Sequence, residues 1–199
     1  MASAGPILDS ASAGATMTRG SPHTVTHSRI PTIRRLDESD LAAAADVIRR
    51  SFATVAEEFG LTRENSPGHT SFMTVDRLTT LFAQGWRMYG LEDDDRLVGY
   101  VALAAGADGV DEMHYLGVVP DSRHRQFGRR LMDFCKGEAV ERGARGISLS
   151  MMEQNTTLKD WYIVHGFAPT GTARFPRLAF TVEYMLWRPG ESAPGPGAG

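Results

Sequence analysis

The fold is decided by residues 118–132, which read VVPDSRHRQFGRRLM. An apolar segment ends at Pro120, an arginine-rich stretch follows, and apolar residues at helical spacing begin at Phe127. This periodicity predicts a helix over 127–141. A loop whose backbone N–H groups lead into a helix N-terminus can bind an anion, because the amides point at the ligand and the helix dipole favours negative charge. The segment therefore predicts a site for the phosphates of a ligand.

Side chains in the same segment fit this interpretation. Gly128 lets a ligand approach the backbone closely, since no Cβ is in the way. Arg123, Arg125 and Arg129 add positive charge and the bidentate reach of a guanidinium to phosphate oxygens. Two other interpretations stay open on this segment alone. The arginines are either ordinary solvated residues beside a tolerated helix glycine, or a basic patch for nucleic acid.

Composition decides against the nucleic-acid interpretation and bounds the rest. The chain has 199 residues, enough for one sizeable core, and its 21 basic and 24 acidic residues give a formal net charge of −3. A dedicated nucleic-acid binder would be basic as a whole. The single cysteine, Cys135, excludes an internal disulfide and a thiolate metal cluster, and its place on the apolar stripe of 127–141 favours packing over a nucleophile. We expect no metal site.

The two ends of the chain differ in composition from the middle. Residues 1–28 are rich in Ala, Ser, Gly and Thr and lack the pattern of a secretory signal, which predicts a disordered extension. Residues 189–199, PGESAPGPGAG, predict a disordered tail. The folded domain is therefore expected over 29–188. No apolar run is long enough to cross a bilayer, so we expect a cytoplasmic protein that needs no membrane; a monomer and a homodimer both stay open.

Helical and extended patterns alternate within this domain. We predict helices at Asp37 or Asp40 to Phe52, at 74–84, at 127–141 and at 155–165, with residues 53–73 irregular after a short helical start. Strands are predicted at 31–36, 86–92, 96–105, 113–119, 146–152, 166–171 and 178–187. The early antiparallel hairpin around Asp93–Asp95 and the late strand–helix–strand unit indicate a mixed α/β domain, not a regular doubly wound sheet.

Residues 118–132 resemble the acetyl-CoA-binding signature of the GCN5-related N-acetyltransferase (GNAT) superfamily. There, a strand ending in Val-x-Pro precedes Arg/Gln-x-x-Gly-x-Gly/Ala and a helix; Arg123 and Gly128 match, while Gln126 stands at the first glycine. The resemblance implies the GNAT fold with splayed central strands, acetyl-CoA as co-substrate, and backbone amides that hold the pyrophosphate. The cofactor-binding residues it implies are Val118, Val119, Arg123, His124, Arg125, Gln126, Phe127, Gly128, Arg129 and Asn155.

Residues 155–167, NTTLKDWYIVHGF, resemble the closing signature of the same superfamily. Asn155, Tyr162, Gly166 and Phe167 fall at its offsets. The resemblance implies that Asn155 helps to hold the pantetheine arm and that Tyr162 protonates the departing thiolate, which a phenol can do. The alternatives are that Asn155 only caps a helix and that Tyr162 only packs.

The base is sought on the segment before Pro120. Acetyl transfer needs a free amine, a polarised carbonyl and a protonated leaving sulfur. The resemblance implies direct attack with both substrates bound and carbonyl polarisation by backbone N–H groups of 113–119, where that strand leaves 146–152. Many relatives carry a glutamate where His114 stands. Glu112 shares its strand face and would orient His114 or raise its basicity. Alternatively, a water relay from Glu112 or bulk solvent removes the proton.

The acceptor side is expected to be covered by residues 53–73. The candidate substrate-binding residues are Glu57, Glu58, Glu64, His69, Phe175 and Glu183, with core packing expected for Phe180. The acceptor itself is a small-molecule or peptide amine of unspecified kind. Two functions from different classes stay open. One is an acetyl-CoA-dependent N-acetyltransferase of an uncharacterised bacterial subgroup, and the other is a non-catalytic acyl-CoA sensor or regulatory module.

Overall fold

The computed structural model describes residues 30–176 and 178–191. The disorder predicted for 1–28 lies outside these residues, as does the predicted tail beyond residue 191. The described part is a mixed α/β domain, as predicted, with one seven-stranded sheet. None of the helices in this part has the length and apolar character that crossing a bilayer requires.

The sheet is antiparallel except at its centre. Its strand order is β1-β2-β3-β4-β5-β7-β6, and only the β4–β5 pair is parallel. The predicted hairpin around Asp93–Asp95 and the predicted closing strand pair are both present. The strands are β1 (Thr32–Arg35), β2 (Arg87–Asp93), β3 (Arg96–Ala105), β4 (Val110–Val118), β5 (Gly146–Met152), β6 (Ala168–Arg174) and β7 (Thr181–Trp187).

Four α-helices pack on this sheet, and one of them corrects the sequence prediction. They are α1 (Leu41–Glu58), α2 (Val75–Ala83), α3 (Phe127–Glu141) and α4 (Thr156–Val164). The prediction ended α1 at Phe52, yet the helix continues for almost two more turns because Ala56 extends its buried face. Of the stretch predicted as irregular, 59–69 lacks helix and strand, and Thr70–Phe72 forms one 3-10 turn.

Helices α1 and α3 cover opposite faces of the sheet. Gly99 pairs with Val118, and a Cβ on Gly99 would meet Leu131 of α3 at 2.9 Å. Gly117, one step along β4, pairs with Tyr100, and a Cβ there would meet Cβ of Ser51 of α1 at 2.8 Å. Because neighbouring residues on a strand face opposite sides, the two helices clamp β3 and β4 between them. Each glycine permits the close approach of one helix.

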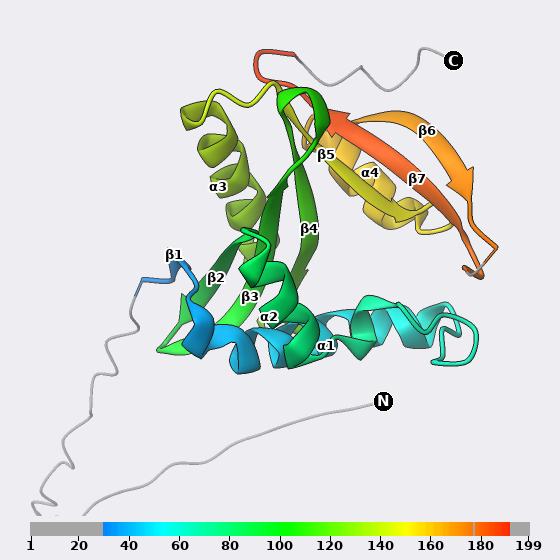
Figure 1. Ribbon diagram of the computed structural model, residues 1–199, viewed down its shortest axis with the longest axis horizontal. Helices are drawn as coiled ribbons and strands as arrows, with labels where there is room; N and C mark the ends of the chain where they lie inside the picture. Colours follow the sequence, from blue (N-terminus) through cyan, green and yellow to red (C-terminus); the bar gives the residue numbers. More distant parts are fainter. Residues whose placement is uncertain (1–29, 177, 192–199) are drawn as a thin grey trace, which may run out of the picture.

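The sheet opens between β4 and β5, as Figure 1 shows. The two strands pair only from Val110↔Gly146 to Glu112↔Ser148, although both run on for several residues. β4 also carries a bulge, since Tyr100 pairs with Gly117 but Ala102 pairs with His114. Tyr115, inside the bulge, has a φ of 57°, an unfavourable conformation for a bulky residue that costs about 1–2 kcal/mol. The bulge bends β4 and leaves its outer edge unpaired with β5.

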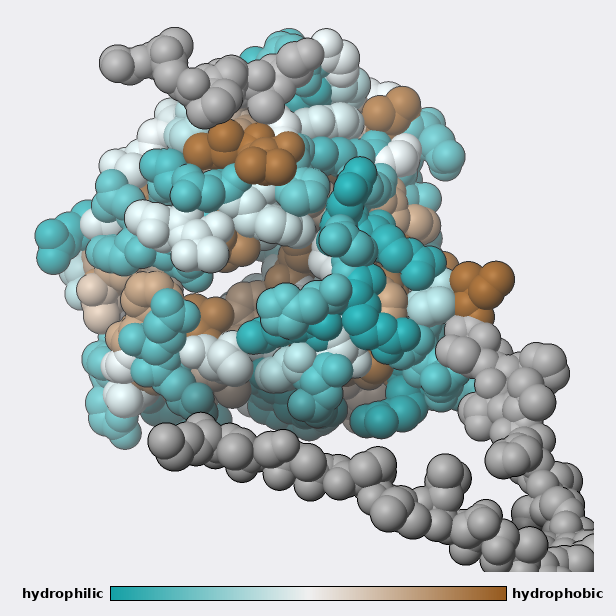
Figure 2. Space-filling model, turned by 180° about the vertical axis from the view of Figure 1, so that it is seen from behind, coloured by the Kyte–Doolittle hydropathy of each residue, from teal (hydrophilic) through white to brown (hydrophobic). Residues whose placement is uncertain are grey.

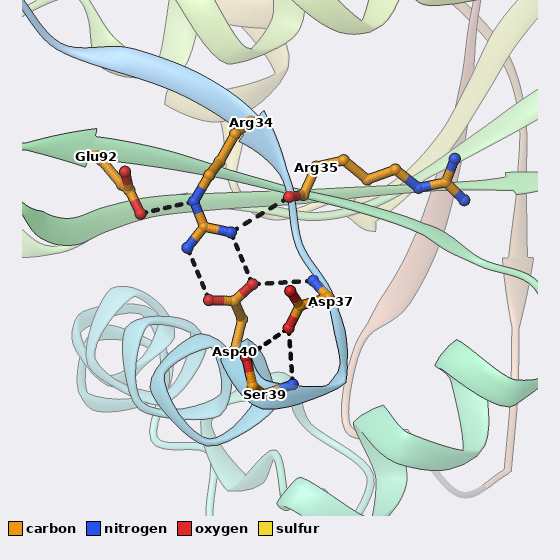
Figure 3. Close-up of polar contacts among 6 residues, drawn as sticks. All are labelled: Arg34, Arg35, Asp37, Ser39, Asp40 and Glu92. Atoms are coloured by element: carbon orange, nitrogen blue, oxygen red, sulfur yellow. Dashed lines mark hydrogen bonds and ion pairs between the residues drawn. The ribbon is translucent and has the colours of Figure 1, made fainter.

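A polar cluster fastens the start of the described chain, shown in Figure 3. Arg34 of β1 donates to both carboxylate oxygens of Asp40 at 2.7 Å and to Glu92 of β2 at 2.8 Å. Asp40 also accepts from the backbone N–H of Asp37 in a capping box. The Arg34 guanidinium lowers the pKa of Asp40 to about 2. This cluster joins β1 and β2 to the turn that begins α1.

The core lies between the sheet and the helices and includes Cys135. This residue is fully buried on the packing face of α3, as the sequence predicted, and burial raises the pKa of its thiol. A buried ion pair, Arg87 Nη2 to Asp111 Oδ2 at 2.5 Å, crosses from β2 to β4 in the same region. These contacts hold the β1–β4 half of the sheet as one rigid support for the open edge of β4.

Candidate functional site

Two cavities meet at the opening between β4 and β5. One has a volume of about 310 Å³ and the other about 420 Å³. They share three lining residues, Leu116 of β4 and Leu158 and Tyr162 of α4. On the face shown in Figure 2 the molecule is hollowed across its middle, with apolar residues visible inside and polar residues around the rim. The opening thus connects two chambers, and the arrangement suits a reaction between two ligands.

The larger cavity is built around the N-terminus of α3, and we call it the α3 groove. Its lining includes His124, Gln126, Phe127, Gly128 and Arg129. His124 and Gln126 both have a φ of 62°, so the loop turns its backbone twice through the left-handed region. Gln126 is the N-cap residue but makes no capping hydrogen bond with its side chain. The first-turn amides of α3 therefore have no side-chain cap, which is the condition for an anion site at a helix end.

The space in front of Gly128 supports the same interpretation. A Cβ on Gly128 would come within 3.7 Å of the Trp161 ring, on the other wall of the α3 groove. The glycine therefore leaves open the volume that a phosphate or the pantetheine chain of coenzyme A needs. Gln126 stands at the place of the signature's first glycine and adopts a left-handed backbone conformation. Because Gln126 has a Cβ, this conformation costs more free energy than it would for glycine.

The arginines of the loop correct part of the sequence interpretation. Arg123 turns inward and donates to Val118 O at 3.2 Å, Ser51 O at 2.8 Å and Thr54 Oγ1 at 3.0 Å. Arg125 pairs with Asp93 and does not line the groove. Both side chains therefore fix the loop to its surroundings. Arg123 and Arg129 both line the α3 groove, and Arg129 is exposed, with its Nε 3.4 Å from Asp133 Oδ2.

The two valines before Pro120 differ in whether they line a cavity. Val118 lines the α3 groove, as expected. Val119 is buried, lines neither cavity, and donates its N–H to Val98 O at 2.9 Å. Its backbone is thus already used in the sheet, and its predicted cofactor contact is not supported. The reason is that the bulge at Tyr115 resets which β4 residues face β3.

Tyr162 lies at the junction of the two cavities. Its side chain is buried, and desolvation raises the pKa of its phenol, so that it carries its proton at neutral pH. The hydroxyl makes no hydrogen bond within the described residues, and it is thus free to donate to a ligand. Asn155 has a capping role, since Oδ1 accepts from Leu158 N at 3.1 Å, and it lines the smaller cavity instead of the α3 groove.

His114 lines the smaller cavity and is held from two sides. Its ring stacks on Trp86 with centroids 4.3 Å apart, and its Nε2 lies 3.2 Å from Glu112 Oε2. An ionised carboxylate only accepts hydrogen bonds, so the proton of the neutral ring belongs on Nε2 and the lone pair on Nδ1. Desolvation lowers the pKa of His114, while Glu112 acts in the opposite direction. The neutral imidazole therefore prevails at neutral pH.

Of the six predicted acceptor contacts, the structure brings only His69 to the smaller cavity. Glu57 and Glu58 end α1 and are exposed, and Glu64 is exposed in the following loop. Phe175 is 43% exposed and lines neither cavity. Glu57 and Glu58 are exposed on α1, whereas Val55 of the same helix lines the cavity. Phe180, expected in the core, lines the cavity instead.

Glu183 is also corrected. It is buried on β7 and pairs with Lys159 Nζ at 2.7 Å, while its neighbour Val182 faces the smaller cavity. Glu183 does not line that cavity, and its carboxylate contacts Lys159 of α4 instead.

Several site residues escaped sequence reasoning. Trp161 forms a wall of the α3 groove, Leu116 and Leu158 flank the junction, and Ser66 lines the smaller cavity with a buried hydroxyl that has no partner among the described residues. Only Trp161 had an available signal, its place beside Tyr162 in the closing signature. The others come from separate elements that only the fold brings together.

The profile of the acetyltransferase (GNAT) family matches residues 54–167, more than half of the chain, a range that contains the whole lining of the α3 groove and most of the lining of the smaller cavity. The chain belongs to the acetyltransferase (GNAT) family. It is an acetyltransferase with acetyl-CoA as co-substrate, and the uncapped α3 N-terminus with the open volume before Gly128 fits that molecule.

Solved structures show the same GNAT fold. The ribosomal-protein-S18-alanine N-acetyltransferase of Escherichia coli aligns with a TM-score of 0.65 and 16% identity over 85% of this chain and 99% of that one. PaiA N-acetyltransferase of Thermoplasma acidophilum, in complex with coenzyme A, gives 0.62 and 22% over 80% and 99%. A spermidine N-acetyltransferase chimera from Vibrio cholerae and hSSAT gives 0.62 and 18% over 79% and 95%. At these identities the likeness concerns the fold alone.

Proposed function

We propose that this GNAT protein is an N-acetyltransferase that moves the acetyl group of acetyl-CoA directly to a primary amine, with both substrates bound together. The observation that carries the proposal is the meeting of the two cavities at Tyr162, Leu116 and Leu158. Coenzyme A would occupy the α3 groove and the amine the smaller cavity, which we call the acceptor cavity. The acetyl group supplied by acetyl-CoA would then lie at the junction, within reach of the amine nitrogen.

His114 takes the role of base in this proposal. Its Nδ1 keeps a free lone pair because Nε2–H is directed to Glu112, and its lowered pKa keeps that lone pair available at neutral pH. Glu112 positions the ring and stabilises the imidazolium once the amine proton arrives. Trp86 fixes the plane of the ring by stacking. We propose His114 instead of solvent as the base because Glu112 and Trp86 both hold its ring in place.

Tyr162 and the open edge of β4 act at the other end of the reaction. Backbone N–H groups past Glu112 on β4 have no partner on β5, so they are available to the acetyl carbonyl oxygen as negative charge develops there. As the new C–N bond forms and the C–S bond breaks, Tyr162 donates its phenolic proton to the departing sulfur. The amine's proton goes to His114, and one proton then passes from His114 through solvent to the Tyr162 phenolate, so protons and charges balance over the cycle.

The single cysteine, Cys135, is not placed to form a covalent acetyl-enzyme. Cys135 is fully buried on α3, lines neither cavity, and has a raised pKa. A thiol in that state is a poor nucleophile. Direct attack in a ternary complex needs no such group.

The test combines turnover with the mass of the protein. Purified full-length protein with acetyl-CoA and a mixed panel of primary amines should release free thiol and yield acetylated amine, and acetyl-CoA should raise the melting temperature. The protein incubated with acetyl-CoA alone should gain no acetyl group, and Cys135→Ala should keep its turnover. A rise in melting temperature without turnover on any amine would instead indicate a protein that only binds acyl-CoA.

A further inference from the structure

The acceptor cavity has an unusual lining for an enzyme that acts on amines. Its described walls contain no Asp, Glu, Lys or Arg side chain. Most of the lining is apolar, contributed by Phe52 and Val55 of α1, Met113 and Leu116 of β4, Leu149, Met151 and Met152 of β5, Leu158 of α4, and Leu178, Phe180 and Val182 near β7. The cavity is thus a hydrophobic chamber with an amine-activating group at its wall.

The polar groups that do line the cavity are neutral. They are the hydroxyls of Ser66, Thr70, Tyr115, Ser150 and Tyr162, the amide of Asn155, and the imidazoles of His69 and His114. Ser71 N–H donates to His69 Nδ1 at 3.3 Å, so the neutral His69 ring carries its proton on Nε2. Glu112, the carboxylate next to the site, contacts His114 but does not line the cavity itself. Among the described residues no carboxylate lines the cavity, so a second cationic group of an acceptor would meet no counter-ion on its walls.

We infer that the acceptor is a small primary amine carried on an apolar group, aromatic or branched aliphatic, without a second positive charge. This inference rests on the proposed transferase function and names its substrate class. An apolar body gains free energy by leaving water for these walls, whereas a second ammonium group would lose its hydration and find no counter-ion. The polyamines and lysine-rich peptides that carry extra positive charges are therefore poor ligands for this cavity.

The size of the chamber favours a small molecule over a protein terminus. Its volume of about 310 Å³ lies at the lower limit of small-molecule sites. Residues 66–70 on one side and Leu178 and Phe180 on another contribute to the same lining as β4 and β5. A chamber of this size, enclosed by segments from several elements, accommodates one compact apolar group instead of an extended peptide.

The experiment compares acceptors that differ only in charge and apolar surface. Thiol release is measured with acetyl-CoA and each of 2-phenylethylamine, 3-methylbutylamine, 1,4-diaminobutane, spermidine, and two short peptides, one with an N-terminal phenylalanine and one with an internal lysine. The two apolar monoamines should give kcat/KM values at least about a hundredfold above those of the diamine and spermidine, as expected when a buried charge has no partner.

A charge-bearing variant tests the cavity itself. Val55→Glu places a carboxylate on the cavity wall from a helical position that accepts glutamate well. It should lower kcat/KM for 2-phenylethylamine and raise it for 1,4-diaminobutane, each by about tenfold or more. Ala43→Glu, an exposed position on the same helix with the same change in net charge, is the matched control and should leave both values unchanged.

The outcomes separate this inference from the proposed function. Equal or better turnover of spermidine, the diamine or either peptide would overturn the substrate class and leave the transferase function intact. No thiol release with any acceptor, in a protein whose melting temperature acetyl-CoA raises, would overturn both. Val55→Glu acting like Ala43→Glu would show that the acceptor does not occupy this cavity, whatever the panel reveals.

Discussion

At the scale of single residues, the proposed mechanism depends most on the phenol of Tyr162. It lies where the two cavities meet, it is buried, and its raised pKa keeps it protonated. Tyr162→Phe keeps the ring and its packing on Phe167 but removes the proton donor. We expect kcat to fall by roughly ten- to a thousandfold, in the range of general-acid contributions, with the Kd for acetyl-CoA little changed.

The control for this change is Tyr184→Phe, because Tyr184 is partly exposed and lines neither cavity. Its kinetic constants should match those of the unaltered protein. Steady-state kinetics and calorimetry with acetyl-CoA measure both variants. Undiminished kcat in Tyr162→Phe would reduce Tyr162 to a packing residue.

His114 carries a prediction about pH. Because its pKa lies below the ordinary 6.5, kcat/KM should stay constant above neutrality and fall as the pH drops through that lowered pKa, where the imidazole becomes protonated. His114→Gln cannot accept the proton, so it should slow the reaction and abolish this acid limb. Glu112→Gln should keep the limb but move it to lower pH, since Glu112 raises the pKa of His114.

The matched control is His165→Gln, at a histidine that lines neither cavity. Its pH profile should coincide with that of the unaltered protein. If the acid limb survived in His114→Gln and vanished in Glu112→Gln, the roles of the two residues would be reversed.

At the scale of elements, the loop before α3 stores backbone strain at Gln126. A non-glycine residue in the left-handed region costs about 1–2 kcal/mol, and a glycine at this position would remove that strain. Glycine loses more chain entropy on folding, however, and this loss offsets part of the stability gained from the relief of strain. Gln126→Gly should therefore raise the free energy of unfolding by less than about 1 kcal/mol and preserve acetyl-CoA binding.

Gln126→Val should show the opposite behaviour. A β-branched residue tolerates positive φ poorly, so the variant should lose about 1–2 kcal/mol of stability and bind acetyl-CoA more weakly as the amides shift. Gln154→Val, at an exposed turn position without positive φ, is the control. Urea unfolding and calorimetry measure both properties; unchanged acetyl-CoA affinity in Gln126→Val would show that the amides at this position do not bind the cofactor.

The sequence predicted elements with regular patterns well and side-chain directions poorly. The bounds of α3 and β5 follow from apolar spacing and agree with the structure. The end of α1 was missed because Ala and Thr after Phe52 carry little periodic signal. The loop arginines were assigned to phosphates, yet the partners of Arg123 and Arg125 lie dozens of residues away in α1 and β2. Local sequence contains no information on such remote partners.

The candidate site likewise has one part that local sequence patterns could indicate and one part that they could not. Most of the lining of the α3 groove, the proposed cofactor site, comes from two short segments, 118–132 and 155–167, so motif spacing alone could indicate both segments. The acceptor cavity draws single residues from α1, the 59–74 segment, β4, β5, α4 and the β6–β7 region. Charge alone drew attention to Glu57, Glu58 and Glu64, whereas the cavity is apolar. No local pattern marks residues that meet only after folding.

At the scale of the whole molecule, stability should decline in acid in two separate ranges. Burial lowers the pKa values of His69 and His114, so the unfolded chain binds more protons just below pH 6.5 and stability falls there. Asp40 has a pKa of about 2 in the folded protein and an ordinary value of 3.8. Its contribution to the free energy of unfolding is therefore complete above pH 3.8 and disappears as the pH falls from 3.8 to about 2. Above about pH 6.5 none of the three groups should cause a change.

Urea unfolding at a series of pH values from neutrality to about pH 3 measures this profile. His69→Asn, whose amide oxygen can still accept from Ser71 N–H, should reduce the loss near pH 6 without altering the one at lower pH. Asp40→Asn should do the reverse. A profile that stayed level down to about pH 4 would contradict the burial of the two histidines.

The acceptor cavity takes part of its wall from residues 66–70 and from Leu178 and Phe180, which lie outside the strand ladders of the sheet. Substitutions in these segments leave the α3 groove and the β4 edge untouched, because neither segment contributes to them. If the two cavities hold the ligands that we propose, substitutions in these segments would exchange one amine for another while the recognition of acetyl-CoA stays the same. A combinatorial library in these two segments that keeps the buried Ser66 unchanged would test whether acceptor preference changes while acetyl-CoA affinity is retained.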